Sequence, residues 1–518
     1  MVAVVKQAAL DLICCYKKGL LDPFLLKSFL LFYSQSRMLV FNKLFNHIES
    51  VLFVFLCLIL LWSPIPLGSH RVWSAALLEL LIATLFCLWL LTMNSHNPLA
   101  KALTQNKKII ILFFLIPLWS ALQLVPLPPD LLNIVSPQVS RYYEDSQAWH
   151  SISVDTGATL YKLQKSIAYA LFFVLSLALI NTPKRLENVA NLVVVSGVLQ
   201  AVYGVLSVLG GEAFDIFHIH DGRQSSTTGT FINRNHLAGY LEMSIAVGVG
   251  LLVTHIIQNK DDYAGLRASI RNFVFTLLSG KARLRVFLAL MVVALVLSHS
   301  RMGNTAFFAS LGVCGVVGLW IYRKSHKAKS LAILFISLIA IDMLILGSWF
   351  GLDQLAARLE GTTVEGDGRF FVFQRSLVLL QDFWLTGSGA GSFYNIFMSY
   401  RDNHSYLFFD FAHNDFLQIA IEYGVIGFAL FGLIVLFSFI RAIQAQQQRQ
   451  TAILKGAGFA AMMGIISLMI HSSSDFNLQI PANALLFTLL CAFACIAHSM
   501  EHQEHHKKKK RLTETTKL

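Results

Sequence analysis

The chain has 518 residues, of which 55% are hydrophobic and only 14% charged. Soluble globular proteins carry about 25% charged residues, so this composition excludes a water-soluble enzyme and predicts a polytopic membrane protein. The 41 Lys and Arg against 29 Asp and Glu give a net charge of +12. Because basic residues gather beside membrane segments, we attribute this charge to membrane anchoring and expect no nucleic-acid partner.

Apolar stretches that can cross about 30 Å of hydrocarbon recur along the whole chain. They predict an all-α fold with about twelve transmembrane helices and a large loop before the tenth. The predicted spans lie near residues 48–67, 73–93, 109–126, 162–181, 188–210, 231–256, 286–299, 304–322, 330–350, 415–440, 456–472 and 482–498.

The segments outside these spans define the expected organisation of the chain. Residues 1–47 are expected to form an extension in the cytoplasm or at the membrane interface. Residues 499–518 are expected to form a basic cytoplasmic tail that meets anionic membrane lipids. The rest comprises, in order, spans one to nine at 48–350 with outer segments 127–161 and 211–230, the large outer loop 351–414, and spans ten to twelve at 415–498.

The distribution of Lys and Arg predicts the orientation of the chain. If the N-terminus is inside, the predicted inner segments hold 30 of the 41 basic residues. Cytoplasmic loops carry such an excess, so both termini are predicted to be cytoplasmic. Because the inner loops are mostly short and basic, we expect the function to lie on the outer side.

Two arginines on the predicted outer side break this charge bias. Arg223 precedes the sixth span, and Arg301 lies in Ser298-His-Ser-Arg-Met-Gly303 between the seventh and eighth spans. Each arginine alone is as compatible with an anchor at a helix end as with a site. A guanidinium group binds phosphate through two parallel hydrogen bonds and keeps its charge. Together the two arginines predict an anionic headgroup, such as a diphosphate, as ligand.

His413 and Asn414 stand at the end of the large loop, and nine intervening residues separate them from Gly424, which Gly427 follows. A histidine at the boundary between water and lipid changes protonation near neutral pH. It can therefore serve as the general base for a sugar hydroxyl. The alternative is a structural helix-capping pair, which the spacing alone slightly favours.

The large loop carries further polar candidates. Arg369 and Arg375 fit sugar or phosphate binding, although solvated loop positions are the simpler interpretation. The glycine-rich run Gly387–Phe393 could turn the chain closely over a substrate. Nothing in the spacing selects one carboxylate to bind sugar or orient a base among Asp367, Asp382, Asp402, Asp410 and Asp415.

These motifs resemble the O-antigen ligase/polymerase superfamily of bacterial envelope glycosyltransferases, and the ligase branch most closely. Two departures are Arg234, where a proline is common, and Met302, where a small residue is usual. The motifs that carry the resemblance are Gly229–Asn235 with the upstream Arg223, Ser298–Arg301, Gly387–Phe393, and His413-Asn414 with Gly424 and Gly427.

The resemblance implies an inverting glycosyltransferase that moves a glycan from undecaprenyl diphosphate to a sugar hydroxyl of lipid A–core, at the periplasmic face of the bacterial inner membrane. It implies that His413 is the general base and that Arg223 and Arg301 bind the diphosphate and stabilise the leaving group. It implies no metal ion and no other cofactor. The residues that we assign to substrate binding are Asn233, Asn235, Ser300, Arg369, Arg375 and Asn414.

Other functions share these features. An O-antigen or exopolysaccharide polymerase, or a protein O-oligosaccharyltransferase, would use the same donor site and differ in its acceptor. A transporter of lipid-linked glycans also suits twelve spans. Transporters usually show repeated halves and polar residues near the bilayer midplane, and neither is evident here, so transport is the less favoured interpretation.

Overall fold

The computed structural model describes residues 47–93, 99–143, 147–210, 226–258, 280–350, 368–400 and 409–500. In these residues the regular secondary structure is helical throughout, with one isolated β-bridge between Leu127 and His150. The predicted all-α fold is therefore confirmed. The following parts lie outside the described residues: 1–46 of the predicted N-terminal extension, 501–518 of the basic tail, 211–225 of an outer segment, and 351–367 and 401–408 of the large loop.

Each predicted span coincides with a helix, although the bounds differ by several residues. The helices are His47–Trp62, α3 (Val72–Thr92), α5 (Lys107–Gln123), α8 (Thr156–Leu179), α9 (Pro183–Gly210), α10 (Arg234–Gln258), α12 (Gly280–Leu297), α13 (Arg301–Tyr322), α14 (Ala328–Phe350), α18 (Asp415–Gln448), α19 (Ala452–His471) and α20 (Pro481–Ser499). In the described part of the chain, those long and apolar enough to cross a membrane are α3, α8, α9, α10, α13, α18, α19 and α20. The chain is thus a polytopic membrane protein.

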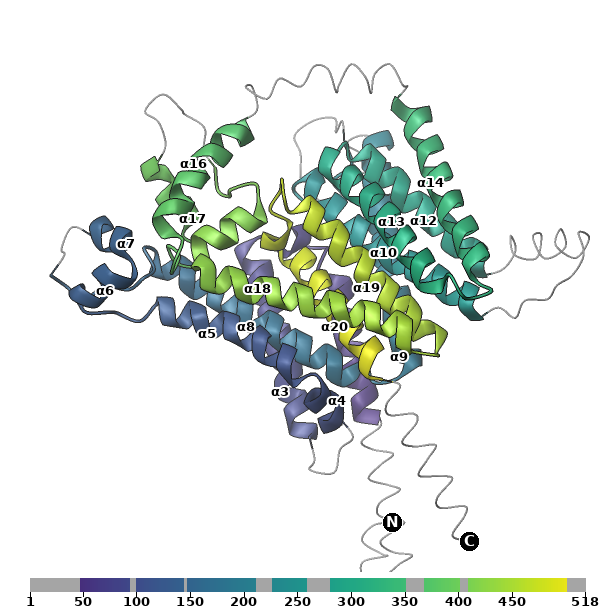
Figure 1. The fold of residues 1–518 in the computed structure, drawn as a ribbon, viewed down its shortest axis with the longest axis horizontal. Helices are drawn as coiled ribbons and strands as arrows, with labels where there is room; N and C mark the ends of the chain where they lie inside the picture. Colours follow the sequence, from purple (N-terminus) through teal and green to yellow (C-terminus); the bar gives the residue numbers. More distant parts are fainter. Residues whose placement is uncertain are drawn as a thin grey trace, which may run out of the picture.

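Helices α10, α19 and α20 form the buried centre of the bundle (Figure 1). Helices α10 and α19 approach closely because glycines face each other. A Cβ atom added at Gly250 would lie 2.4 Å from the carbonyl oxygen of Gly456. Small residues allow this close packing of membrane helices. By contrast, α3 and α18 expose large apolar side chains such as Leu91 and Leu436, which suits helices that face lipid.

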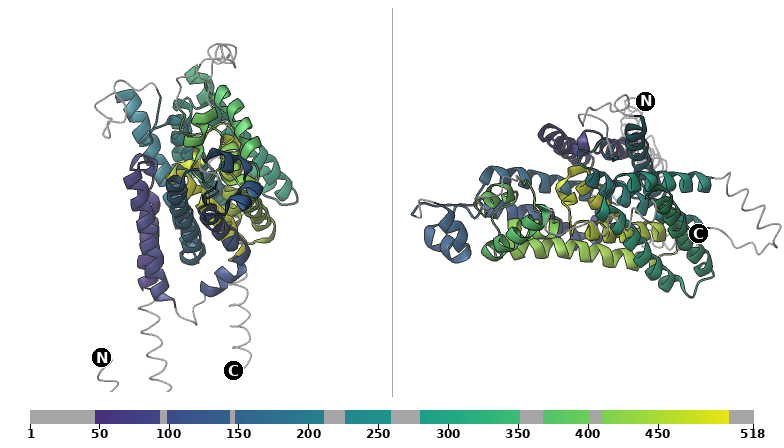
Figure 2. Two further views of the ribbon diagram at one scale, coloured as in Figure 1. Left: turned by 90° about the vertical axis from the view of Figure 1, so that its left-hand side faces the viewer. Right: turned by 90° about the horizontal axis from the view of Figure 1, so that it is seen from above.

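Shorter helices lie between the spans, and two of them occur in the segment that was predicted as a large loop. They are α4 (Leu99–Gln105), α6 (Pro129–Val135), α7 (Pro137–Tyr142), α16 (Gly368–Phe383) and α17 (Phe393–Phe397), with 3-10 turns η1 (Leu67–Ser69), η4 (Met398–Tyr400) and η5 (Asn477–Gln479). Val372 of α16 and Phe393 of α17 share a second apolar core with Leu132 of α6. Figure 1 and the right-hand view of Figure 2 show α6 and α7 projecting from the bundle.

Helix α18 is two helical segments joined by a kink at Gly424, which has φ +63°. A Cβ atom at Gly424 would lie 2.3 Å from the carbonyl oxygen of Leu385, so both the backbone conformation and the available space require glycine. The backbone N–H groups of Ser388 and Gly389 donate to the carbonyl oxygens of Ile421 and Glu422, at 2.9 and 3.1 Å. The glycine-rich run therefore packs against the kink, and this contact accounts for it without a substrate.

Candidate functional site

A polar cavity of about 280 Å³ lies at the end of the bundle where α10 and α18 begin. It brings together Asn233 and His413, which the sequence predicted as site residues in two motifs far apart in the chain. The turn between the first two helices and the segment before α18 complete it. The lining residues are Leu67, His70, Ile232, Asn233, His236, Phe409, Asp410, Phe411, His413 and Phe476.

His413 lines this cavity in an unusual backbone conformation. Its φ of +49° is in the left-handed region, which costs a residue other than glycine about 1–2 kcal/mol. Its imidazole meets the edge of Phe476, with ring centroids 4.9 Å apart. Backbone strain of this kind often occurs at functional sites, and here it accompanies an imidazole that lines the cavity.

Asn414 caps helix α18, as the structural alternative expected. Its Oδ1 accepts a hydrogen bond from the backbone N–H of Leu417 at 3.0 Å. Its Nδ2 donates to the carbonyl oxygen of Ser473 at 2.8 Å. Both ends of the amide are engaged by protein, so these contacts account for Asn414 without a substrate.

His236 is a site residue that the sequence analysis missed. It lies in the first turn of α10, is 5% exposed and lines the polar cavity. Its Nε2 lies 3.8 Å from Oδ1 of Asp475 and receives no hydrogen bond from the described residues. Its ring centroid is 4.7 Å from that of Phe476. The detectable signal was Asp475, an acidic residue between two apolar spans.

His70 supplies a third imidazole to the cavity. It follows η1, and its ring centroid lies 6.3 Å from that of Phe411. Burial, followed by the positive charges of Lys165, Arg71 and Lys162, lowers the pKa of His70 to about 4. His70 is therefore neutral at neutral pH and too weak a base to take a proton from a hydroxyl efficiently.

The Gly229–Asn235 motif connects three parts of the structure. The hydroxyl of Thr230 donates to the carbonyl oxygen of Pro64 at 2.5 Å, and its backbone N–H donates to Oε1 of Gln200 on α9 at 3.0 Å. Oδ1 of Asn233 accepts from the backbone N–H of Asn235 at 2.9 Å. The motif thus positions Asn233 in the cavity, while Asn235 is buried and does not line it.

Arg301 lies outside the lining of the polar cavity, at the exposed start of α13. Ser300 is buried and caps this helix, with its hydroxyl accepting from the backbone N–H of Gly303 at 3.2 Å. A Cβ atom at Gly303 would lie 3.3 Å from Cε1 of His471, the last residue of α19. Ser473, two residues after His471, accepts a hydrogen bond from Asn414. The start of α13 at Arg301 therefore lies at the same end of the bundle as His413.

The other predicted residues are placed as follows. Arg223 lies outside the described residues, and so do Asp367 and Asp402. Arg375 lies on α16, with its guanidinium carbon 5.7 Å from the ring centroid of Phe371, outside the polar cavity. Arg369 is also on α16, but its side chain is not among those described.

Only Asp410 among the described candidate carboxylates lines the polar cavity. Asp382 accepts hydrogen bonds from Gln138 at 2.9 Å and from the hydroxyl of Tyr400 at 2.6 Å. Asp415 is fully buried and accepts from the hydroxyl of Ser472 at 2.8 Å. The structure thus gives Asp382 and Asp415 structural contacts and leaves Asp410 as the carboxylate at the site.

The comparison with known families bears on the same region. Residues 286–432 match the family model described as O-Antigen ligase, which confirms the predicted resemblance. The matched segment runs from α12 past the kink of α18 and contains Arg301 and His413. The match supports a glycosyltransferase-like enzyme of O-antigen ligase or polymerase type. No curated protein matches the chain.

Proposed function

We propose, from the match of residues 286–432 to the O-antigen ligase family model, that the protein is an inverting glycosyltransferase. It moves a glycan from undecaprenyl diphosphate to a sugar hydroxyl of lipid A–core, at the periplasmic face of the bacterial inner membrane. The observation that carries the proposal is the polar cavity at one end of an apolar bundle, lined by His413 and Asn233. Such a cavity suits a sugar whose carrier lipid remains in the membrane.

In the proposed reaction the acceptor hydroxyl oxygen attacks the anomeric carbon of the donor glycan. The bond from that carbon to the diphosphate oxygen breaks, and its electron pair leaves with the lipid diphosphate. His413 takes the proton of the hydroxyl as the new bond forms. Attack from the face opposite the leaving group inverts the anomeric centre, and no covalent intermediate forms.

Arg223 and Arg301 are proposed to bind the diphosphate as negative charge builds on it. In a water-excluded site such a contact is worth about 3–4 kcal/mol, and Arg301, at the exposed start of α13, is expected to contribute less. His236, beside Asp475, and the neutral His70 are available to hydrogen-bond sugar hydroxyls. The proposed roles therefore divide between arginines for the leaving group and imidazoles for the sugars.

The first test is transfer by the purified protein in nanodiscs, with undecaprenyl-diphosphate glycan and lipid A–core. We expect His413→Ala to lower the rate by about 10²–10⁴-fold, because general base catalysis contributes that much. The control is His326→Ala, in the exposed connection between α13 and α14. Wild-type transfer by His413→Ala would remove this residue from the chemistry.

The second test concerns the leaving group. We expect Arg301→Lys to lower the rate by about 10–100-fold, because an ammonium group does not replace the two parallel hydrogen bonds of a guanidinium. Arg285→Lys, at an exposed position on α12, is the matched control. Equal rates for the two variants would contradict the role of Arg301.

A panel of acceptors separates this function from its alternatives. Lipid A–core, a second lipid-linked glycan and an acceptor protein are each offered with the same donor. We expect transfer to lipid A–core. Transfer to the lipid-linked glycan alone would instead identify a polymerase, and transfer to the protein alone a protein O-oligosaccharyltransferase.

A further inference from the structure

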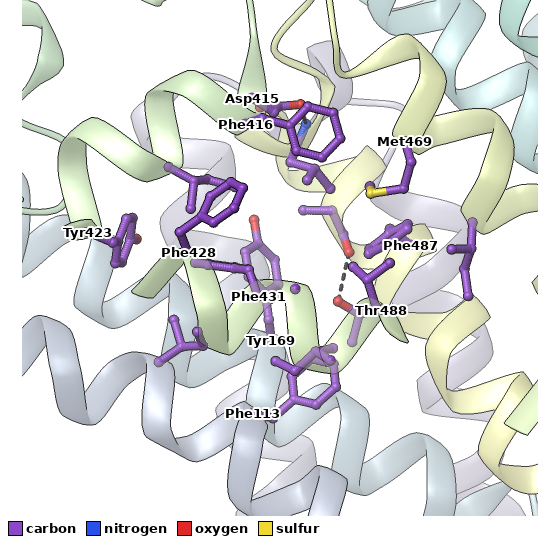
Figure 3. A pocket seen from close by; sticks show the side chains of 18 of the residues that line it. Phe113, Tyr169, Asp415, Phe416, Tyr423, Phe428, Phe431, Met469, Phe487 and Thr488 are labelled. Carbon is purple, nitrogen blue, oxygen red and sulfur yellow. Dashed lines mark hydrogen bonds between the residues drawn. The ribbon is translucent and has the colours of Figure 1, made fainter. Parts of the chain in front are cut away.

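A second, larger cavity of about 490 Å³ lies among α5, α8, α18, α19 and α20 (Figure 3). Most of its wall is aromatic or aliphatic, including Phe113, Phe428, Phe431, Met469 and Phe487. Figure 3 shows Asp415 at the opposite end of this cavity from Phe113. We call it the apolar cavity.

Two lysines of α8 line the apolar cavity, where an unpaired cation is costly. Lys162 and Lys165 are three residues apart and so lie on one face of the helix. Lys165 is only 9% exposed, and its Nζ lies 4.2 Å from the ring centroid of Tyr161. Burying an ammonium group among apolar side chains is unfavourable unless an anion accompanies it. The part of the cavity that these two lysines line therefore favours an anionic group.

The acidic groups near these lysines are already engaged or lie elsewhere. Asp415 accepts hydrogen bonds from the hydroxyl of Ser472 and the backbone N–H of Leu478, at 2.8 and 3.0 Å. Lys162 donates to Oε1 of Gln479. Glu79 of α3 acts electrostatically on Lys165 but does not line the cavity. A ligand is thus the group that can bring a further negative charge to the lysines.

The apolar cavity opens towards the lipid along α18. Phe428 and Leu436 line it and are 41% and 53% exposed. After the kink, its lining on this helix extends from Phe428 to Phe439, which at about 1.5 Å per residue spans about 16 Å. That length is roughly half of the hydrocarbon thickness of about 30 Å. A long apolar chain can therefore enter from the side and lie along the helix.

The cationic end of the apolar cavity adjoins the polar cavity. Asp415 lines the first and His413, two residues earlier, lines the second. Gln479 lines the first and Phe476, three residues earlier, lines the second. A molecule in which an anionic group joins a long apolar chain to a sugar would fit both cavities at once. Its chain and anionic group would lie in the apolar cavity and its sugar in the polar cavity.

We propose that the apolar cavity binds the isoprenoid chain of the lipid-linked donor next to its diphosphate, with Lys162 and Lys165 facing that diphosphate. The inference rests on the proposed function. It adds two cationic residues on α8 to the donor site and assigns the chain to the groove along α18. The lysines contribute to binding of the donor, because its diphosphate is anionic before glycan transfer begins.

Gly432 allows a direct test of the chain site. It lines the apolar cavity, and a Cβ atom added there meets no atom within 4 Å. The Cβ atom of Gly432→Phe therefore meets no clash, and we expect its ring to enter the cavity. Gly312 of α13 has the same open surroundings and does not line the cavity, so Gly312→Phe is the matched control.

The measurement is photocrosslinking of photoreactive undecaprenyl diphosphate, without glycan, to the full-length protein in phosphatidylcholine nanodiscs. We expect Gly432→Phe to bind at least about tenfold more weakly, because the added ring takes the volume of the chain. Gly312→Phe is expected to bind as the wild type does. Unchanged binding by Gly432→Phe would overturn the chain site.

The lysines are tested with a charged and an uncharged lipid. We expect Lys162→Met and Lys165→Met each to weaken binding of the diphosphate lipid about tenfold, through loss of a charge-assisted contact. Binding of undecaprenol, which has no phosphate, is expected to stay the same. Lys184→Met, at an exposed position on α9, is the control. Equal weakening for both lipids would overturn the assignment of the lysines to the diphosphate.

Two further outcomes are decisive. If phosphatidylglycerol in the nanodisc displaces the photoreactive lipid at equal concentration, the cavity is a general site for anionic lipids and the proposal fails. Because the binding measurement needs no acceptor, it also separates the proposed glycosyltransferase function from the proposed binding site for the lipid chain. If the wild type and the variants bind the lipid as expected but the wild type transfers no glycan, only the proposed function is contradicted. If the wild type transfers glycan but the variants bind the lipid as tightly as it does, only the chain site is contradicted.

Discussion

The polar and apolar cavities adjoin the same short stretch, residues 413–415, and are built from different parts of the helices. The polar cavity is lined by turns and helix starts, whereas the apolar cavity is lined mainly by the sides of helices. Helix ends leave backbone groups without partners inside the helix, so polar and capping residues gather there. The sides of membrane helices are mostly apolar. Position along a helix therefore decides which chemistry a cavity receives.

The kink at Gly424 lies in α18 between Tyr423 and Phe428, which both line the apolar cavity, and breaking it is expected to have the largest effect. Gly424→Ala places a Cβ atom 2.3 Å from a backbone oxygen at a positive φ. We expect a loss of about 3 kcal/mol or more in stability, measured as a lower apparent melting temperature in detergent. Gly432→Ala, on the same helix in open space, is the control. Equal melting temperatures for the two variants would show that the kink is not required.

His236 tests whether the polar cavity works through more than one imidazole. We expect His236→Asn to fold and to lower the transfer rate about tenfold, the value of roughly one hydrogen bond to a sugar. His255→Asn, near the other end of the same helix, is the control. A transfer rate equal to that of the wild type would show that His236 has no role in transfer.

Substitution of His70 is expected to have the smallest effect, a change in stability that appears only when the pH is lowered. The pKa of His70 is about 4 in the folded protein and about 6.5 when unfolded, so the unfolded chain binds more protons between these values. The folded state is therefore favoured above pH 6.5 and loses this advantage as the pH falls towards 4.

The measurement is the apparent melting temperature in detergent at pH 7 and at pH 5. We expect it to fall further for the wild type than for His70→Asn, whose side chain does not titrate. A larger fall for His70→Asn would mean that acid stabilises the folded wild type through this residue.

The helices could be predicted because crossing the hydrocarbon core requires a minimum length and an apolar composition. The kink inside α18 could not, since Gly424 has a partner, Leu385, on another segment. The same limit applied to the site. Asn233 and His413 were predicted from their motifs, but His236 was not, because one histidine at a helix start has no sequence signal until Asp475 and Phe476 lie beside it.

The roles of polar residues were the least predictable part. Ser300 and Asn414 were predicted to bind substrate, and each caps a helix. Four aspartates of the predicted large loop and Asp415, at the start of the next span, were equivalent in the sequence, and of those described only Asp410 lines the polar cavity. A side-chain oxygen can cap, bind or bridge, and the choice depends on its neighbours in space.

The sequence by itself determined that this protein lies in the membrane as a bundle of helices, because hydropathy is a property of the residues alone. It also indicated the resemblance to O-antigen ligases, which the match over residues 286–432 supports, because the motifs around Arg301 and His413 are local. Only the tertiary structure decided that His413, His236 and His70 line one cavity and that Lys162 and Lys165 line another beside it. These sites join side chains from helices distant in sequence, and packing alone sets such distances.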